Sequence, residues 1–251
     1  MEHWDALCPG GLHIVYEDAL FQPGTDSFLL SSLPRLKPGL RVCDLGCGTG
    51  LLGLLLLQRQ SGLRVTGLEL QAAAVTLAQK AIEKNNLQDA LTVMECDLRD
   101  VKSQFKTGSF DLVVCNPPYY PPQSGSVSDN PALQKARAET TCTLEDVCRA
   151  AAYLLRWSGS FCLVHKPERL TDLLCTLRQT AIEPKRLRMV TQRSGAAPWL
   201  VLVEGRLGGN PGLTIEADLV LEHPEGGFSD EMLALYGKPE RILPPEKRAQ
   251  E

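Results

Sequence analysis

Four consecutive residues, Asn116-Pro117-Pro118-Tyr119, follow a short apolar run and carry the clearest chemistry in the sequence. The side-chain oxygen of Asn116 can accept a hydrogen bond from an –NH2 group, and Tyr119 offers a ring face to a planar base. Each proline restricts the residue before it to extended backbone, so the segment should be rigid. This tetrad predicts a clamp for a flat amine, whereas two prolines alone would indicate only a turn.

A second motif lies upstream, where Asp44, Gly46, Gly48 and Gly50 alternate with other residues between an apolar strand and an apolar helix. Glycine permits positive φ and the close approach of a ligand, so the segment predicts a nucleotide-cofactor loop. No Gly-Lys-Ser/Thr follows, which excludes a Walker loop, and the spacing G-x-G-x-G differs from the dinucleotide fingerprint. A carboxylate at Asp44 would repel a pyrophosphate but could hold an ammonium, which favours S-adenosylmethionine.

Two acidic residues end or follow the next predicted strands. Glu69 ends a strand predicted over 64–69, about 20 residues past the loop, where a doubly wound fold places an acid for ribose hydroxyls. Asp97 follows a strand predicted over 91–95 and could accept from the adenine amine of the cofactor. Alone, either acid would be read as a helix cap or a solvated charge. Their spacing from the glycine loop favours cofactor binding.

Length and composition indicate one α/β domain in a chain of 251 residues. No apolar stretch is long enough for a membrane span, and the N-terminus shows no signal peptide. The nine cysteines contain no C-x-x-C pair, which favours a reducing cytoplasm, and the four histidines are too scattered to predict a metal site.

The net charge of −4 argues against a protein covered in nucleic acid, but one basic cluster stands out. Such a cluster could bind phosphates or be an ordinary solvated face, and the sequence does not choose between these readings. Its members are Lys185, Arg186, Arg188 and Arg193, with Arg169 and Arg178 on the preceding predicted helix.

Strand and helix patterns alternate along the chain, which predicts a Rossmann-like α/β fold with helices on both faces of a mostly parallel seven-stranded sheet. The seventh strand should be antiparallel because it forms a hairpin with the sixth. Strands are predicted over 41–45, 64–69, 91–95, 110–116, 160–165, 186–191 and 199–204, and helices over 51–60, 71–86, 144–156 and 168–180. Thr143 and Asp146 resemble a capping box.

We divide the chain into an N-terminal segment (1–38) packing on the core, a catalytic core (39–205), a C-terminal extension (206–238) and a polar tail (239–251). Within the extension, 213–222 is predicted to be extended and 229–236 to form a short helix. Residues 121–131, rich in Pro, Ser, Gly and Asn, are predicted to form a mobile loop that closes over a substrate.

Together, the glycine loop, Glu69, Asp97 and the tetrad resemble a class I S-adenosylmethionine-dependent methyltransferase. More narrowly, the chain resembles the bacterial valine-tRNA adenine-N6 methyltransferases over nearly its whole length. This likeness includes Gly24-Thr25-Asp26-Ser27-Phe28-Leu29-Leu30, Ala136-Arg137-Ala138-Glu139 and Leu235-Tyr236-Gly237. One departure is Ala138, where the family pattern usually carries histidine.

The resemblance implies that Asn116, Pro117 and Tyr119 hold the target amine. Thr25 and Asp26 are placed near the methionine end of the cofactor, or else they cap a helix. The full set of expected cofactor-binding residues is Thr25, Asp26, Asp44, Gly46, Cys47, Gly48, Gly50, Glu69, Leu70, Asp97, Leu98 and Asn116. The expected substrate-binding residues are Pro118, Tyr119, Tyr120 and Arg137.

Three planar amines fit the tetrad: adenine N6, guanine N2 and the side-chain amide of glutamine. The absence of room for a helical N-terminal domain disfavours the glutamine reading, and the lack of an appended domain disfavours ribosomal guanine. The residues 213–236 also look too few to recognise a DNA sequence. We therefore expect a monomer that methylates adenine in tRNA, without a metal or a membrane. A non-catalytic RNA-binding scaffold and a dinucleotide oxidoreductase are the alternatives from other classes.

Overall fold

The computed structural model describes residues 1–18, 24–117, 119 and 142–237. Several expectations fall outside these residues and are not addressed by the structure. They concern Pro118, Tyr120, Arg137, Ala138, the predicted loop over 121–131 and the tail over 239–251.

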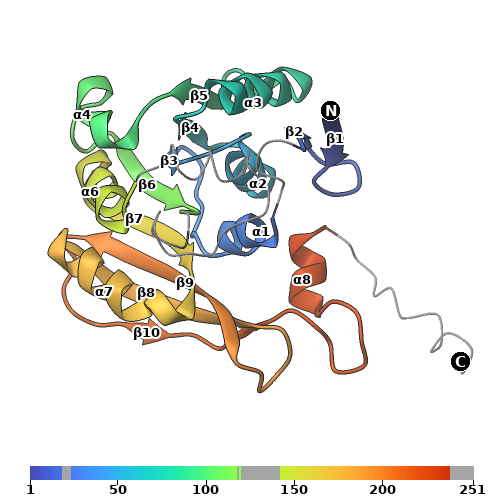
Figure 1. Cartoon of the computed structure of the whole chain (residues 1–251), viewed down its shortest axis with the longest axis vertical. Helices are drawn as coiled ribbons and strands as arrows, with labels where there is room; N and C mark the ends of the chain where they lie inside the picture. Colours follow the sequence, from blue (N-terminus) through green and yellow to red (C-terminus); the bar gives the residue numbers. More distant parts are fainter. Residues whose placement is uncertain (19–23, 118, 120–141, 238–251) are drawn as a thin grey trace, which may run out of the picture.

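One central sheet organises the described chain (Figure 1). Its strands lie in the spatial order β10 (Thr214–Ile215), β8 (Ile182–Thr191), β9 (Pro198–Leu207), β7 (Leu155–His165), β6 (Phe110–Cys115), β3 (Arg41–Leu45), β4 (Arg64–Glu69) and β5 (Leu91–Glu95). A further short strand, β11 (Leu219–Val220), also pairs with β8.

The run from β7 to β5 is parallel, and β9 is antiparallel to both of its neighbours. The Rossmann-like class and the antiparallel seventh strand are therefore confirmed. The predicted strand number was too low, because β10 and β11 extend the sheet beyond β8 as two-residue strands that carry little periodic signal.

Helices cover both faces of this sheet (Figure 1). One face packs against α1 (Thr25–Ser32), α2 (Leu51–Arg59) and α3 (Ala72–Lys84), and the other against α4 (Val101–Gln104), α6 (Leu144–Leu154) and α7 (Leu170–Gln179). Short 3-10 turns, η1 (Leu98–Asp100) and η2 (Pro167–Arg169), precede α4 and α7. Residues 51–57 of α2 are all buried, as expected for a helix that is apolar all round.

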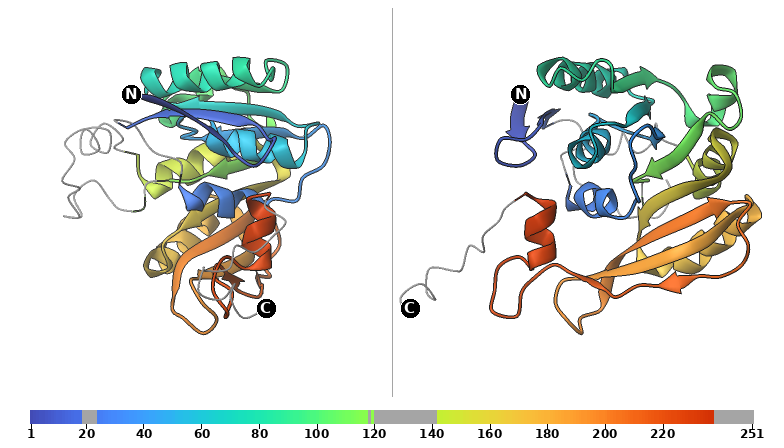
Figure 2. Two further views of the ribbon diagram at one scale, coloured as in Figure 1. Left: turned by 90° about the vertical axis from the view of Figure 1, so that its right-hand side faces the viewer. Right: turned by 180° about the vertical axis from the view of Figure 1, so that it is seen from behind.

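The expected capping box opens α6, where Asp146 N–H donates to Thr143 Oγ1 and Thr143 N–H donates to Asp146 Oδ2. The short C-terminal helix α8 (Asp230–Leu235) lies beside α1 (Figure 2). Its position against α1 brings the chain's C-terminal extension back to the same face as α2.

An N-terminal hairpin of β1 (Glu2–Ala6) and β2 (His13–Glu17) packs against α3, and the sequence did not predict it (Figure 2). Asn85 fixes the hairpin through two hydrogen bonds. His13 N–H donates to Asn85 Oδ1 at 2.8 Å, and Asn85 Nδ2 donates to the His13 carbonyl at 2.7 Å. Because β1 is mostly exposed, it lacks the alternation that marks a half-buried strand.

The alternation of core residues shows which face each site residue occupies. Val42 packs with the α1–α3 side, whereas Cys43 and Leu45 pack with the α6–α7 side. Successive side chains of a strand point to opposite faces, so Asp44 points toward α2. Residues an even number of positions apart on a strand share a face. Glu69 therefore lies on the α2 side with Val65, and Asn116 lies there with Val114. All three lie at the carboxyl ends of neighbouring parallel strands.

Candidate active site

A tight glycine turn follows β3 and leads into α2. Gly46 N–H and Cys47 N–H both donate to the Leu68 carbonyl, at 2.8 and 3.1 Å. Gly46, Gly48 and Gly50 have φ values of +69°, +54° and +84°, a left-handed conformation that side chains disfavour. A Cβ added to Gly46 or Gly48 would meet no atom within 4 Å of the described structure. The turn therefore presents bare backbone beside open space, as a cradle for a ligand requires.

Asp44 lies at the base of this turn and is only 2% exposed. Burial, and then the nearby Glu69 carboxylate, raise the pKa of Asp44 to about 7, although a hydrogen bond from the Gly53 backbone opposes this. Its Oδ2 atom has no hydrogen-bond partner in the part of the chain that the structure describes. A buried carboxylate oxygen without a donor is unfavourable, and a cationic ligand would satisfy it.

Glu69 is fixed by the two segments that flank it. Gly48 N–H donates to Glu69 Oε2 and Gln71 N–H donates to Oε1, each at 2.9 Å. Each carboxylate oxygen keeps a second lone-pair site, so Glu69 can still accept from a pair of hydroxyls. Residues Asp44, Gly46, Gly48 and Glu69 therefore have the chemistry that S-adenosylmethionine needs.

Cys47 packs inside the glycine turn rather than pointing away from it. A Cβ added to Gly67 would lie 2.6 Å from Cys47 Sγ, so the glycine of β4 makes room for the thiol. Burial, followed by the charge of Asp44, raises the pKa of Cys47 well above its ordinary value. The thiol is thus a small buried side chain that supports the turn.

Asn116 and Tyr119 lie at the end of β6, next to the glycine turn, because Cys115 pairs with Leu45 in the register of β6 and β3. Asn116 Nδ2 donates to Ser27 Oγ at 3.3 Å. The Tyr119 hydroxyl donates to the Asp26 carboxylate and lies 3.2 Å from Asn116 Oδ1. Since the hydroxyl has a single proton, Asn116 Oδ1 retains the capacity to accept from a substrate amine.

Burial raises the pKa of Tyr119 far above its ordinary value, and the Asp26 carboxylate adds to the effect. The ring therefore stays a neutral phenol, suitable for stacking. Asp26 is the second residue of α1, whose N-cap is Gly24 without a side-chain cap, so neither Thr25 nor Asp26 caps the helix. The contact of these two residues with the cofactor stays a prediction.

Asp97 is engaged within the chain. It caps η1, accepting from Arg99 N–H and from Arg99 Nε, each at 2.9 Å, and this hydrogen bonding lowers the pKa of Asp97. An adenine amine would share the carboxylate with Arg99. The half-buried Leu70 and Leu98 directly follow Glu69 and Asp97 in the chain.

Three residues that sequence reasoning missed contact the tetrad. Ser27 holds the Asn116 amide, His165 makes an edge contact with the Tyr119 ring at a centroid distance of 5.6 Å, and Lys166 lies over that ring. His165 ends β7, the strand that neighbours β6, and Lys166 directly follows it. Polar residues at the end of an adjacent parallel strand were the available signal, because such ends meet at one edge of a sheet.

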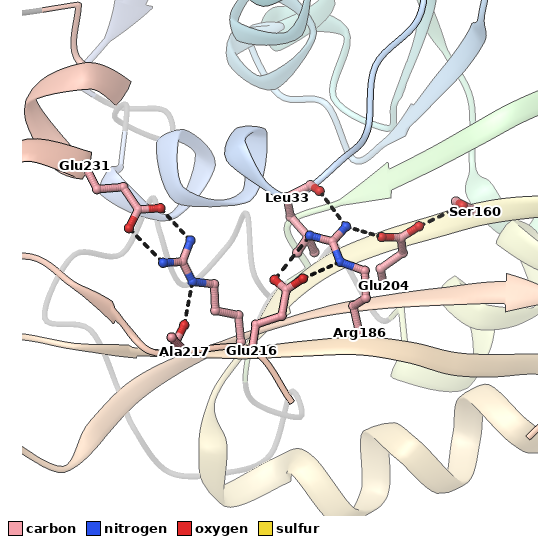
Figure 3. Close-up of polar contacts among 8 residues, drawn as sticks. Leu33, Ser160, Arg186, Glu204, Glu216, Ala217 and Glu231 are labelled. Atoms are coloured by element: carbon pink, nitrogen blue, oxygen red, sulfur yellow. Dashed lines mark hydrogen bonds and ion pairs between the residues drawn. The ribbon is translucent and has the colours of Figure 1, made fainter. Parts of the chain in front are cut away.

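The predicted basic cluster is largely neutralised by acidic partners (Figure 3). Arg186 pairs with Glu204 and Glu216, Arg188 with Glu231, Arg193 with Glu222, Arg169 with Asp172 and Arg178 with Glu183. Lys185 donates to the Asn210 carbonyl. Apart from the local pair of Arg169 and Asp172, the partners are distant in the sequence or lie on a different element. This pairing argues for the solvated-face reading over a phosphate-binding patch.

Residues 12–180 match the family model of the methyltransferase small domain. The chain belongs to this family. A tRNA1(Val) (adenine(37)-N6)-methyltransferase from Dickeya chrysanthemi is 33% identical over 72% of this chain and 72% of its own length. A relative of the same name from Tolumonas auensis is 30% identical over 89% of this chain and 91% of its own.

The fold of this methyltransferase is shared with solved structures. A predicted O-methyltransferase from Agrobacterium tumefaciens superposes with a TM-score of 0.69, at 21% identity, covering 88% of this chain and 99% of that one. The chain is thus a class I methyltransferase that uses S-adenosylmethionine. Within the described residues, no helix could cross a membrane, and no three His, Cys, Asp or Glu side chains gather as metal ligands.

Proposed function

We propose that this methyltransferase methylates the exocyclic N6 amine of an adenine in tRNA. The observation that carries the proposal is the Asn116 amide beside the glycine turn. Ser27 accepts from its Nδ2, and its Oδ1, which lies 3.2 Å from the Tyr119 hydroxyl, can still accept from a substrate amine. Two relatives whose printed names state tRNA adenine-N6 methylation support the choice of substrate.

The chain's residues would hold the cofactor at the carboxyl edge of the sheet. Asp44 would take its ammonium, the backbone of Gly46 and Gly48 would allow its close approach, and Glu69 would accept from its ribose hydroxyls. When bound, S-adenosylmethionine supplies a methyl group activated by a sulfonium. Two observations support this placement of the cofactor: Asp44 Oδ2 has no hydrogen-bond partner among the described residues, and the backbone of the glycine turn borders open space.

Asn116 and Pro117 would activate the amine. The lone pair of an aromatic amine is spread into the ring, which makes it a poor nucleophile. The Asn116 side-chain oxygen and the Pro117 main-chain oxygen would each accept one of its N–H groups and favour a pyramidal nitrogen. They also stabilise the positive charge that develops on nitrogen, in the manner of a preorganised electrostatic site. No strong base is required, since the proton leaves after the new bond forms.

Tyr119 would receive the base. A base in structured RNA must leave its stack to reach the Asn116 amide. Stacking on an aromatic ring returns about 1–3 kcal/mol per base, and the hydrogen bond from the Tyr119 hydroxyl to Asp26 fixes the ring that offers this face.

Methyl transfer to a tRNA transcript tests the proposal. The protein is incubated with isotope-labelled S-adenosylmethionine and tRNA, and the RNA is digested for nucleoside mass spectrometry. We expect label in N6-methyladenosine and none with Asn116→Ala. Label in N2-methylguanosine, or in a protein glutamine instead of RNA, would contradict adenine as the substrate and indicate one of the other planar amines.

We also propose that the enzyme acts as a monomer in the cytoplasm, where tRNA is its partner. Light scattering of the purified protein, alone and with tRNA, tests the first point, and fractionation of cells tests the second. A stable dimer without RNA would contradict the monomer.

A further inference from the structure

Lys166 directly follows β7 and lies beside the tetrad. Its Nζ atom is 5.1 Å from the centroid of the Tyr119 ring and 5.1 Å from that of the Trp199 ring, and it donates to the Trp199 carbonyl at 3.4 Å. Strands β6 and β7 are parallel neighbours, so their carboxyl ends meet at the same edge. The ammonium thus contacts both the ring assigned to the target base and a second aromatic ring from β9.

This ammonium has no acidic counter-ion among residues 1–18, 24–117, 119 and 142–237, where its contacts are the two rings and one carbonyl. The contrast with the nearby arginines is clear, because Arg169, Arg186 and Arg188 are each paired with a carboxylate. An ammonium carries three N–H donors, and within the part of the chain that the structure describes it uses one of them. Among the described residues, Lys166 therefore keeps two donors that no residue occupies, next to the tetrad.

We propose that Lys166 binds a backbone phosphate adjacent to the target adenosine and so positions the nucleotide for transfer. This inference rests on the proposed function. A nucleotide whose base swings out to Tyr119 brings its own phosphates to the same edge of the sheet. Lysine binds phosphate as a point charge, and the ring of Trp199 offers a stacking face to a neighbouring base. Lys166 is thus a positioning residue of the substrate site.

The test compares Lys166→Met, which keeps most of the apolar stem, with Lys166→Arg, which keeps the charge. Lys185→Met is the matched control, since its ammonium is bound to the Asn210 carbonyl away from the tetrad. Binding of a tRNA transcript is titrated at several salt concentrations, and KM and kcat are measured separately. Affinity for S-adenosylhomocysteine and the melting temperature are recorded for each protein.

We expect Lys166→Met to raise KM for tRNA by about tenfold and to reduce the slope of log affinity against log salt by about one, the contribution of a single phosphate. Lys166→Arg should keep KM for tRNA and the salt slope close to the wild-type values. Lys185→Met should match the wild type in both quantities. Affinity for S-adenosylhomocysteine should not change.

An unchanged salt slope in Lys166→Met would overturn the phosphate contact, even if kcat fell through loosening of Tyr119. Failure of the proposed function has a different signature. In that case the wild-type protein would form no N6-methyladenosine. The Lys166→Met variant would still bind tRNA with a smaller salt slope than the wild type. A wild-type protein without salt-dependent binding to tRNA would overturn both.

Discussion

At the residue scale, the proposed chemistry depends on the Asn116 amide. Ser27 accepts from its Nδ2 end, and this leaves the oxygen end for a substrate. Within the described residues, the hydrogen bonds given for the Asn116 side chain go to Ser27 and Tyr119 and not to the glycine turn, so we expect that mutation can separate the two halves of the site. In the proposed mechanism, one half holds the cofactor and the other activates the amine.

Asn116→Ala should therefore remove transfer without removing the cofactor. Loss of one preorganised polar group that stabilises developing charge lowers kcat by about 100- to 1,000-fold. Affinity for S-adenosylhomocysteine, measured by calorimetry, should stay close to the wild-type value. An active Asn116→Ala enzyme would take this residue out of the mechanism.

Two substitutions of Tyr119 separate its ring from its hydroxyl. Tyr119→Ala should raise KM for tRNA by about tenfold or more, since base stacking on an aromatic ring contributes about 1–3 kcal/mol. Tyr119→Phe keeps the ring face and loses the hydroxyl's contacts with Asp26 and Asn116, so its KM should rise much less. Steady-state kinetics with a tRNA transcript distinguish the two. Equal effects of both variants would place the main role in the hydroxyl.

At the element scale, α1 is tied to the sheet at both of its ends. Asp26 and Ser27 in its first turn contact Tyr119 and Asn116. At the other end, the Leu33 carbonyl accepts from Arg186, whose guanidinium also binds Glu204 and Glu216 (Figure 3). The basic side chain on β8 thus fixes the helix that supports the tetrad.

Arg186→Met should destabilise the protein by about 3–5 kcal/mol, because the buried Glu204 carboxylate would lose the guanidinium that balances its charge. Arg193→Met is the matched control. That arginine is 76% exposed and pairs with Glu222, and an exposed ion pair contributes about 1 kcal/mol at most. Urea unfolding of both variants measures the difference. Similar losses of stability would show that the Arg186 network contributes no more than a surface pair.

The sequence predicted the elements that carry strong local patterns. The bounds of β3, β4 and β5 agree with expectation because short apolar runs end at Gly or acidic residues. The hairpin β1–β2 was missed because β1 is mostly exposed and β2 shows no strict alternation of buried and exposed residues. The start of β7 was missed because it directly follows α6 with no turn residue between them, so the helix was predicted to continue to residue 156. The sequence also did not show which charged side chains form ion pairs across the sheet. Arg186 meets Glu204 and Glu216 only through the sheet, so charge alone suggested a basic patch.

At the scale of the whole molecule, the sheet brings separate motifs to one edge. Asp44, Glu69 and Asn116 lie at the carboxyl ends of three different strands, and the parallel order β6–β3–β4 makes those strand ends neighbours. Two carboxylates on the same face repel each other, and this repulsion adds to the burial that raises the pKa of Asp44. The stability of the whole chain is therefore linked to the protonation of the proposed cofactor site.

Because the pKa of Asp44 is raised in the folded protein, the stability of the fold should fall as pH rises. The pKa of Asp44 is about 7 in the folded protein, against about 3.9 for an unperturbed aspartate in the unfolded chain. Between these values the folded state binds more protons, so the stabilisation is complete below pH 4 and is lost as pH rises to 7. The difference amounts to about 4 kcal/mol.

Unfolding in urea from pH 4 to 8 should thus show a decline for the wild type that Asp44→Asn lacks. Glu69→Gln should move the decline to lower pH, since one of the two causes of the shift is gone. An ammonium held by Asp44 needs the ionised carboxylate, so S-adenosylhomocysteine should bind about tenfold more weakly at pH 6 than at pH 8. Calorimetry at the two pH values measures this. Parallel unfolding profiles for wild type and Asp44→Asn, together with a pH-independent affinity, would mean that Asp44 does not hold the cofactor's charge.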